Sequence, residues 1–248
     1  MTQQSPPEIR TERTHQLFLK VTKCSSKIFT DQTGRFPITS SHHYKYIMIA
    51  YDYDSNNILE EPMKSRTRLH KKDAYQKIRK LLCSRGLIPR THVLDNECSK
   101  VSKEYMEEEN ENFHLVPPHL RRRNAAERAI QTFKKHFIAG MVSTHKKSPL
   151  HLWCHILPQA IVTLKLLCPS RINPTLSSHA QLHGLFDFNA TPFAPPVTKV
   201  IVHQNPTVRK SWAPRGKDGW YIDRSKDHYR CYNIYVPETR AVIQPEIV

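Results

Sequence analysis

The segment that most restricts the fold is residues 43–63, where two strand-like runs follow one another across a turn. HYKYIMIAYDYD is rich in aromatic and β-branched residues, which favour an extended strand. Asp-Ser-Asn-Asn has the composition of a turn, and ILEEPM follows it as a second strand. The run SKIFTDQTG, just upstream, is a shorter strand with its own turn signal. Three strands joined by tight turns predict an antiparallel meander.

After this meander, helical and strand-like patterns alternate. The predicted elements are, in order, a helix over 67–86, a buried strand over 88–95, an acidic helix over 99–110, a strand over 112–118, and helices over 124–142 and 149–167. We expect Pro158 to kink the last helix, because proline cannot donate a backbone hydrogen bond. This order predicts an α/β fold with helices packed on a mixed sheet.

The remaining segments divide the chain. Residues 1–25 are polar and predict an N-terminal arm, residues 26–168 form the α/β core, and the proline-containing stretch 169–197 is typical of an irregular linker. Residues 198–248 contain several short strands punctuated by glycine and proline, which predict a small C-terminal all-β module of barrel-like form.

The charge of the chain indicates its partner. The 248 residues include 38 Lys and Arg against 22 Asp and Glu, a formal net charge of +16, which favours a polyanion such as nucleic acid. A basic membrane-surface protein is the competing interpretation. We find no apolar run near the ~18 residues of a spanning helix and no signal peptide in the polar start MTQQSPPEIR. The expected location is nuclear or cytoplasmic, without secretion and without a membrane.

The cysteine pattern argues against a disulfide framework or a zinc ribbon. All six cysteines are isolated in the sequence, with no Cys-x-x-Cys pair. The nearest approach to a metal cluster is His151, Cys154 and His155, which share one helical face in HLWCHIL. The apolar neighbours of these residues favour an ordinary core helix over a metal site.

One acidic residue, Glu127, lies among cations. Between Leu115 and Leu150 there are eight Lys and Arg and this single carboxylate. Asn124 and Glu127 have the spacing of a helix capping box, which explains the glutamate but not the surrounding positive charge. A carboxylate that holds a metal ion over a polyanion is the alternative interpretation.

Two aspartates end predicted strands. Asp31 ends the first strand and Asp95 the fourth, and each taken alone is more typical of a turn. If these strands are neighbours, both aspartates lie at one sheet edge, and the later helix can bring Glu127 over them. Three carboxylates at close range repel unless a cation neutralises them. Mg²⁺ prefers such oxygen ligands, and a pair of ions would suit phosphoryl transfer.

The segments TDQTGRFPITSS, KYIMIAYDYDSN, LDNE and PPHLRRRNAAERAIQTFK together resemble the catalytic core of retroelement integrases, the DDE family of polynucleotidyl transferases. The resemblance covers about residues 27–165. It implies an RNase H-like five-stranded mixed sheet flanked by helices, and a catalytic, metal-binding triad of Asp31, Asp95 and Glu127. It also implies Mg²⁺ or Mn²⁺, two ions, DNA ends and target DNA as partners, and a homo-oligomer. Asp95 and Glu127 lie 32 positions apart, slightly closer than in the family, so a shortened loop is expected before the helix.

Polar and basic residues around the triad are candidates for binding the phosphates of DNA. These candidates are Arg121, Arg122, Arg123, Arg128, Gln131, Lys134 and Lys135. Ten further Lys and Arg between positions 64 and 90 form either a solvated face or a second phosphate-tracking surface. Trp212 and Trp220 in the tail could stack on bases, although a core role is the simpler interpretation.

The resemblance implies 3′-end processing and strand transfer, that is, DNA integration. The chain departs from the family at its start, where His15 and Cys24 do not supply the spacing of a His₂Cys₂ zinc module. Two alternatives therefore stay open: a catalytically inactive DNA-binding remnant of a pol polyprotein, and a simple metal-dependent nuclease.

Overall fold

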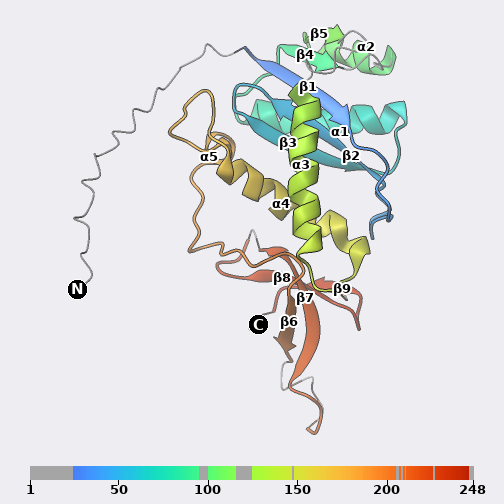
Figure 1. The fold of residues 1–248 in the computed structure, drawn as a ribbon, viewed down its shortest axis with the longest axis vertical. Coiled ribbons are helices and arrows are strands. Elements are labelled where there is room, and N and C mark those ends of the chain that lie inside the picture. The colour runs from blue at the N-terminus through green and yellow to red at the C-terminus, as the bar shows by residue number, and fades with distance from the viewer. Residues whose placement is uncertain are drawn as a thin grey trace, which may run out of the picture.

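The computed structural model describes residues 25–94, 100–115, 125–146, 148–204, 207, 209, 211–225 and 227–245. Residues 1–24 of the predicted N-terminal arm, Asp95, the three arginines Arg121, Arg122 and Arg123, and Asn124 lie outside these residues. The described chain builds two sheets with five α-helices and one 3₁₀ turn (Figure 1).

The predicted meander is confirmed. Strands β1 (Lys27–Gln32), β2 (Tyr46–Asp52) and β3 (Asn57–Met63) pair antiparallel, with Asp31 opposite Ile49. The tight turn between β2 and β3 is held by Asp52, whose carboxylate accepts hydrogen bonds from the backbone N–H and the hydroxyl of Ser55. The aromatic and β-branched sequence of β2 is buried almost throughout, as expected for an internal strand.

Two short parallel strands extend this sheet. Strand β4 (Thr91–Leu94) pairs parallel with β1, and β5 (Asn112–Leu115) pairs parallel with β4. The strand order is therefore β3-β2-β1-β4-β5, with β1 at the centre. The mixed five-stranded sheet predicted from the sequence is confirmed.

Helices cover both faces of the sheet. On one face, helices α3 (Ala125–Val142) and α4 (Trp153–Leu167) pack on the side chains of Phe29, Ile47 and Ile49. On the other face, helices α1 (Arg68–Ser84) and α2 (Lys100–Glu108) pack on the alternate residues of the same strands, including Ile28 and Met48. This alternation follows from the two-residue period of a strand, and it gives the sheet two separate cores.

The helix boundaries agree with the sequence pattern. Helix α1 ends just before Gly86, whose positive φ of 75° is the left-handed conformation that glycine adopts most easily. Helix α3 begins at Ala125 and buries Ala126, Ile130, Phe133 and Phe137 along one side. Helix α4 follows the 3₁₀ turn Leu150–Leu152 and remains one helix through Pro158.

The segment 169–197, predicted as an irregular linker, contains one short helix and is packed on the core. Helix α5 (Ser178–His183) begins at the N-cap Ser177, whose side chain accepts a hydrogen bond from the N–H of Ala180 at 3.0 Å. Leu182 is buried against the α1 face of the sheet, and Val197 joins the core on the α3 face. Proline content alone did not reveal these buried contacts.

The C-terminal all-β module is confirmed. Strands β6 (Lys199–His203), β7 (Gly216–Arg224), β8 (Tyr232–Val236) and β9 (Ala241–Ile243) form an antiparallel sheet in sequential order. In the described chain, β6 and β9 are the outer strands of this sheet, so the expected barrel-like closure is not observed.

The module is joined to the α/β core by apolar packing and by hydrogen bonds. Trp220 and Ile222 of β7 belong to the same core cluster as helices α3 and α4. The hydroxyl of Tyr221 donates to the side-chain oxygen of Gln159 on α4 at 2.7 Å. Trp220 is therefore a core residue, as the simpler interpretation held, whereas Trp212 is 98% exposed.

One helical stretch of the described chain, Leu150–Leu167, is long and apolar enough to cross a membrane by composition, with a mean hydropathy of 1.3. The expectation that no such run exists is therefore wrong. Half of this stretch is buried inside the protein, and a core helix has the same composition. Trp153, Leu157 and Ile161 lie in the core between the two sheets, which accounts for the apolar sequence.

Candidate active site

Asp31 lies at the end of the central strand and faces helix α3. Its strand partner Ile49 and its neighbour two residues earlier, Phe29, both belong to the core that α3 covers. Residues that oppose one another in a sheet share a face, and so do residues two apart in a strand. Asp31 is half-buried, and its carboxylate accepts a hydrogen bond from the N–H of Gln32 at 2.6 Å.

Glu127 lies in the first turn of α3, as predicted. Helix α3 contacts both β1 and β2, and the neighbours Ala126 and Ala129 are buried against the sheet, whereas Glu127 is half-buried. Asp31 and Glu127 therefore lie on adjoining elements, on the same face of the sheet. The capping-box alternative depends on Asn124, which lies outside the described residues.

The third predicted ligand, Asp95, also lies outside the described residues. The described part of β4 ends at Leu94, which pairs in parallel with Thr30 of β1. In the sequence, an aspartate follows each of these two paired residues. The condition on which the triad depends, that β1 and β4 are neighbours, is met.

The predicted phosphate-binding residues of α3 are on the surface. Arg128, Gln131, Lys134 and Lys135 are all exposed. At 100° per residue, Gln131 and Lys134 lie on the same side of the helix as Glu127, and Arg128 lies about 100° away from it. Arg128 instead lines a hollow of about 250 Å³ together with Tyr51, Tyr53 and Arg171.

A buried polar network, which sequence reasoning missed, supports the sheet behind Asp31. The Thr30 hydroxyl and the Nε2 atom of His92 on β4 share a hydrogen bond of 2.7 Å, on the face opposite to Asp31. The His92 ring stacks on Tyr75 of α1, with ring centroids 4.3 Å apart. The hydroxyl of Tyr75 donates a hydrogen bond to the carboxylate of Glu111. The sequence feature that could have indicated this network is a histidine, His92, within a short apolar strand.

Burial determines the charges in this network. It lowers the pKa of His92 to about 3, so this imidazole is neutral at pH 7. Burial also raises the pKa of Glu111, although hydrogen bonding from Tyr75 and the charge of Arg79 oppose that effect. The His92 Nδ1 and Glu111 Oε1 atoms are 3.8 Å apart. With a neutral imidazole and this separation, the pair is a polar contact and not an ion pair.

The pKa of His92 predicts an acid-sensitive fold. The unfolded chain protonates this histidine near pH 6.5, whereas the folded chain does so near pH 3. The stabilisation that depends on neutral His92 is therefore fully present above pH 6.5. It is lost as the pH falls from 6.5 toward 3, by up to about 1.4 kcal/mol per pH unit. We expect the free energy of unfolding, measured by urea denaturation, to fall between pH 6.5 and 5, and less steeply in a His92→Gln variant. An equal slope in both proteins would contradict the assignment of this pH dependence to His92.

The strand order β3-β2-β1-β4-β5, with three antiparallel strands followed by two parallel ones and helices on both faces, is that of the RNase H-like fold. No protein-family model and no curated protein matches the sequence.

Three of the solved structures with a similar chain course are retroviral. The first is the simian T-cell lymphotropic virus intasome in complex with PP2A regulatory subunit B56 gamma, with a TM-score of 0.49 and 14% identity over 88% of this chain and 75% of that chain. The second is the HTLV-2 integrase catalytic core domain in complex with magnesium, with a TM-score of 0.46 and 18% identity over 63% of this chain and 95% of that chain. The third is the BIV integrase catalytic core domain, with a TM-score of 0.42 and 16% identity over 57% of this chain and 84% of that chain. At identities this low, what the chain does has to be inferred from its own residues.

Proposed function

We propose that the chain is a metal-dependent polynucleotidyl transferase of the integrase type, which processes DNA 3′ ends and joins them to target DNA. One observation carries the proposal. Asp31, at the end of the central strand, and Glu127, in the first turn of α3, occupy the same face of an RNase H-like sheet. A capping role for Glu127 would not require Asp31 on that face.

Asp95 completes the proposed site. Thr30 and Leu94 are paired in register, and the aspartates that follow them in the sequence, Asp31 and Asp95, would supply two of the three carboxylates. Three carboxylates are a donor set that suits Mg²⁺ or Mn²⁺, since both are hard cations that prefer oxygen. A bound pair of such ions would activate the attacking oxygen and stabilise the leaving one. Asp31, Asp95 and Glu127 would hold these ions at the edge of the sheet.

The protein's own cations would position the DNA. Lys134 and Lys135 are exposed on α3, about two turns beyond Glu127. Together with Arg128, Gln131 and the arginines at 121–123, they would contact phosphates, which carry most of the affinity of such a complex. We also propose that the active form is a homo-oligomer, because joining two DNA ends to one target requires two sites.

A strand-transfer assay on the purified chain, with labelled DNA ends, target DNA and Mg²⁺, tests this function. Joined product that disappears with EDTA supports the integrase proposal. Cleavage of the labelled DNA without joining would overturn it in favour of a nuclease. Salt-sensitive DNA binding with neither reaction would overturn it in favour of a non-catalytic remnant.

The salt dependence of DNA binding should locate the DNA on the α3 face. We expect the double variant Lys134→Ala/Lys135→Ala to bind duplex DNA more weakly, and the slope of log K against log salt to become shallower by up to about 2, since about 0.9 is lost per phosphate contact. The matched variant is Lys71→Ala/Lys72→Ala on α1, which covers the opposite face. If the α1 pair changes the slope and the α3 pair does not, DNA binds the other face. Fluorescence anisotropy at several salt concentrations measures both slopes.

A further inference from the structure

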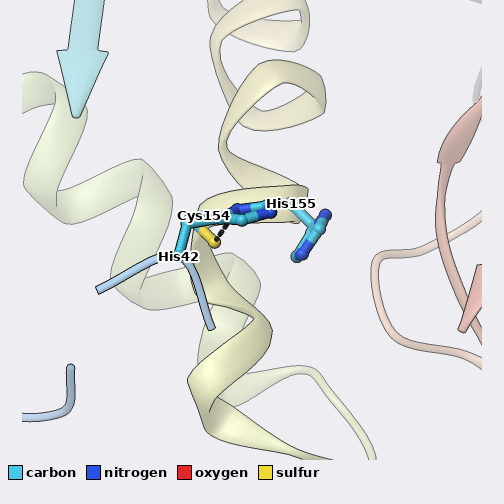
Figure 2. A group of neighbouring side chains, drawn as sticks. All are labelled: His42, Cys154 and His155. Carbon is cyan, nitrogen blue, oxygen red and sulfur yellow. Dashed lines mark hydrogen bonds between the residues drawn. The ribbon is translucent and has the colours of Figure 1, made fainter. Parts of the chain in front are cut away.

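Three potential metal ligands meet at a place that the proposed reaction does not use. His42 lies in the loop between β1 and β2, and Cys154 and His155 lie in the first turn of α4 (Figure 2). One ligand atom from each residue lies within 4.8 Å of the other two, and no other group of three in the described chain meets that condition. In the sequence, His151 shared a helical face with Cys154 and His155, and a core helix was the favoured interpretation. In the structure His151 is exposed, with its ring against Tyr235, and His42 takes its place beside the other two.

The spacing of these atoms approaches that of a coordination sphere. Nδ1 of His42 is 3.5 Å from Sγ of Cys154, and the rings of His42 and His155 have centroids 4.6 Å apart. In a tetrahedral zinc site with ordinary Zn–S and Zn–N lengths, sulfur and nitrogen ligands lie about 3.5 Å from each other. The His42–Cys154 pair already has this separation, and a rotation of the half-buried His155 side chain would bring in the third ligand.

The loop that carries His42 is fixed by hydrogen bonds. The N–H of Ser41 donates to the carbonyl of His151 at 2.8 Å, which ties the loop directly to the start of α4. The N–H of His43 donates to the carbonyl of Ser40 at 2.9 Å, and His43 has a positive φ of 63°, so the chain turns tightly here. His42 is therefore held beside α4 without a metal ion, which lowers the entropy that binding would cost.

The Ser41 hydroxyl lies beside two of the three ligands. Its Oγ atom lies 3.0 Å from Nε2 of His155 and 3.5 Å from Sγ of Cys154. A hydroxyl with polar contacts to two of the three ligands marks a position that a fourth ligand, either this oxygen or a water molecule, would take. Cys154 is buried whereas His42 is exposed, so the cluster is open to solvent on the side of the loop.

We propose that His42, Cys154 and His155 bind one Zn²⁺ ion, with an oxygen as fourth ligand, and that this ion fastens the β1–β2 loop to helix α4. Two imidazoles and a thiolate select a borderline-soft cation, in contrast to the carboxylates that suit Mg²⁺. On binding, the Cys154 thiol releases its proton to solvent and the thiolate coordinates the ion. The loop follows directly after Asp31, so the ion would stabilise the segment that leaves the central strand.

Cobalt substitution provides a direct test. The full chain is stripped with a chelator, dialysed and titrated with Co²⁺ alone and then with Zn²⁺ alone. We expect a thiolate-to-cobalt charge-transfer band that saturates at one Co²⁺ per chain, and loss of that band when Zn²⁺ displaces cobalt; Co²⁺ bound by carboxylates does not contribute to this band. Failure of the wild-type chain to develop the band would overturn the proposal.

Variants assign the ligands. Cys154→Ser and His42→Ala should each weaken Zn²⁺ binding by 100-fold or more, and Cys154→Ser should abolish the charge-transfer band. The matched controls are His151→Ala, one turn before the cluster, and Cys168→Ser, at the other end of α4, both of which should leave the band and the affinity unchanged. Because His42 lies in an exposed loop, its variant stays informative even if Cys154→Ser fails to fold. A band that persists in folded Cys154→Ser, or that is lost in either control, would overturn the assignment.

Discussion

The Glu127→Gln variant should lose DNA joining by about 10² to 10⁴-fold while binding DNA at least as tightly as the parent. The proposed ligand is removed, and metal stabilisation of a developing charge amounts to several kcal/mol, which corresponds to that range of rates. DNA affinity should be unchanged or higher, because a negative charge beside the phosphates is neutralised. Single-turnover strand transfer with Mg²⁺ and fluorescence anisotropy measure the two quantities.

A matched variant separates this loss from a general effect of charge. Glu104→Gln makes the same substitution at an exposed position on α2, where the carboxylate forms an ion pair with Lys100. Joining by this variant should be unchanged. If Glu127→Gln joins DNA at the parental rate, the carboxylate is not a metal ligand and the capping-box interpretation of Glu127 is favoured.

The largest loss of stability is expected for Trp153→Ala. Trp153 is fully buried, its ring stacks on Phe36 at 4.5 Å, and its Nε1 donates to the carbonyl of Ile38 at 2.9 Å. The substitution opens a cavity and leaves the carbonyl of Ile38 without this donor, so we expect a loss of about 3–5 kcal/mol in the free energy of unfolding. Guanidinium denaturation followed by circular dichroism measures it.

The exposed Trp212 provides the control for this prediction. Trp212→Ala removes the same side chain at a position that is 98% exposed, and the unfolding free energy should change by less than about 0.5 kcal/mol. Should Trp153→Ala prove insoluble, Trp153→Phe keeps most of the apolar volume and should cost less. Equal effects of Trp153→Ala and Trp212→Ala would show that the β1–β2 loop does not depend on the Trp153 contact.

Local sequence patterns were sufficient to predict most of the fold. The aromatic run of β2, the helical period of α3 and the glycine after α1 each specify an element through short-range physics, and the structure has all three. The parallel pairing of β1 with β4 could be anticipated only as a condition for Asp31 and Asp95 to meet. It depends on contacts between residues far apart in the sequence, which no local pattern determines.

The parts that could not be predicted depend on such distant contacts. His92 is neutral because it is buried, between Tyr75 of α1 and Glu111 of the turn before β5, so three segments that are distant in the sequence meet here. The grouping of His42 with Cys154 joins positions 112 residues apart. The segment around Val197 is packed because it contacts residues of the C-terminal sheet, and its proline content does not indicate that contact.

The shared core of the two sheets has an evolutionary consequence. Because Trp220 and Ile222 of β7 pack among the same side chains as α3 and α4, the boundary between the sheets is made of matched apolar surfaces on both sides. Recombination that replaced the last fifty residues with those of a distant homologue would bring together surfaces that had not evolved in contact. The C-terminal sheet and the α/β core should consequently be inherited together, with substitutions on α4 and β7 arising in concert.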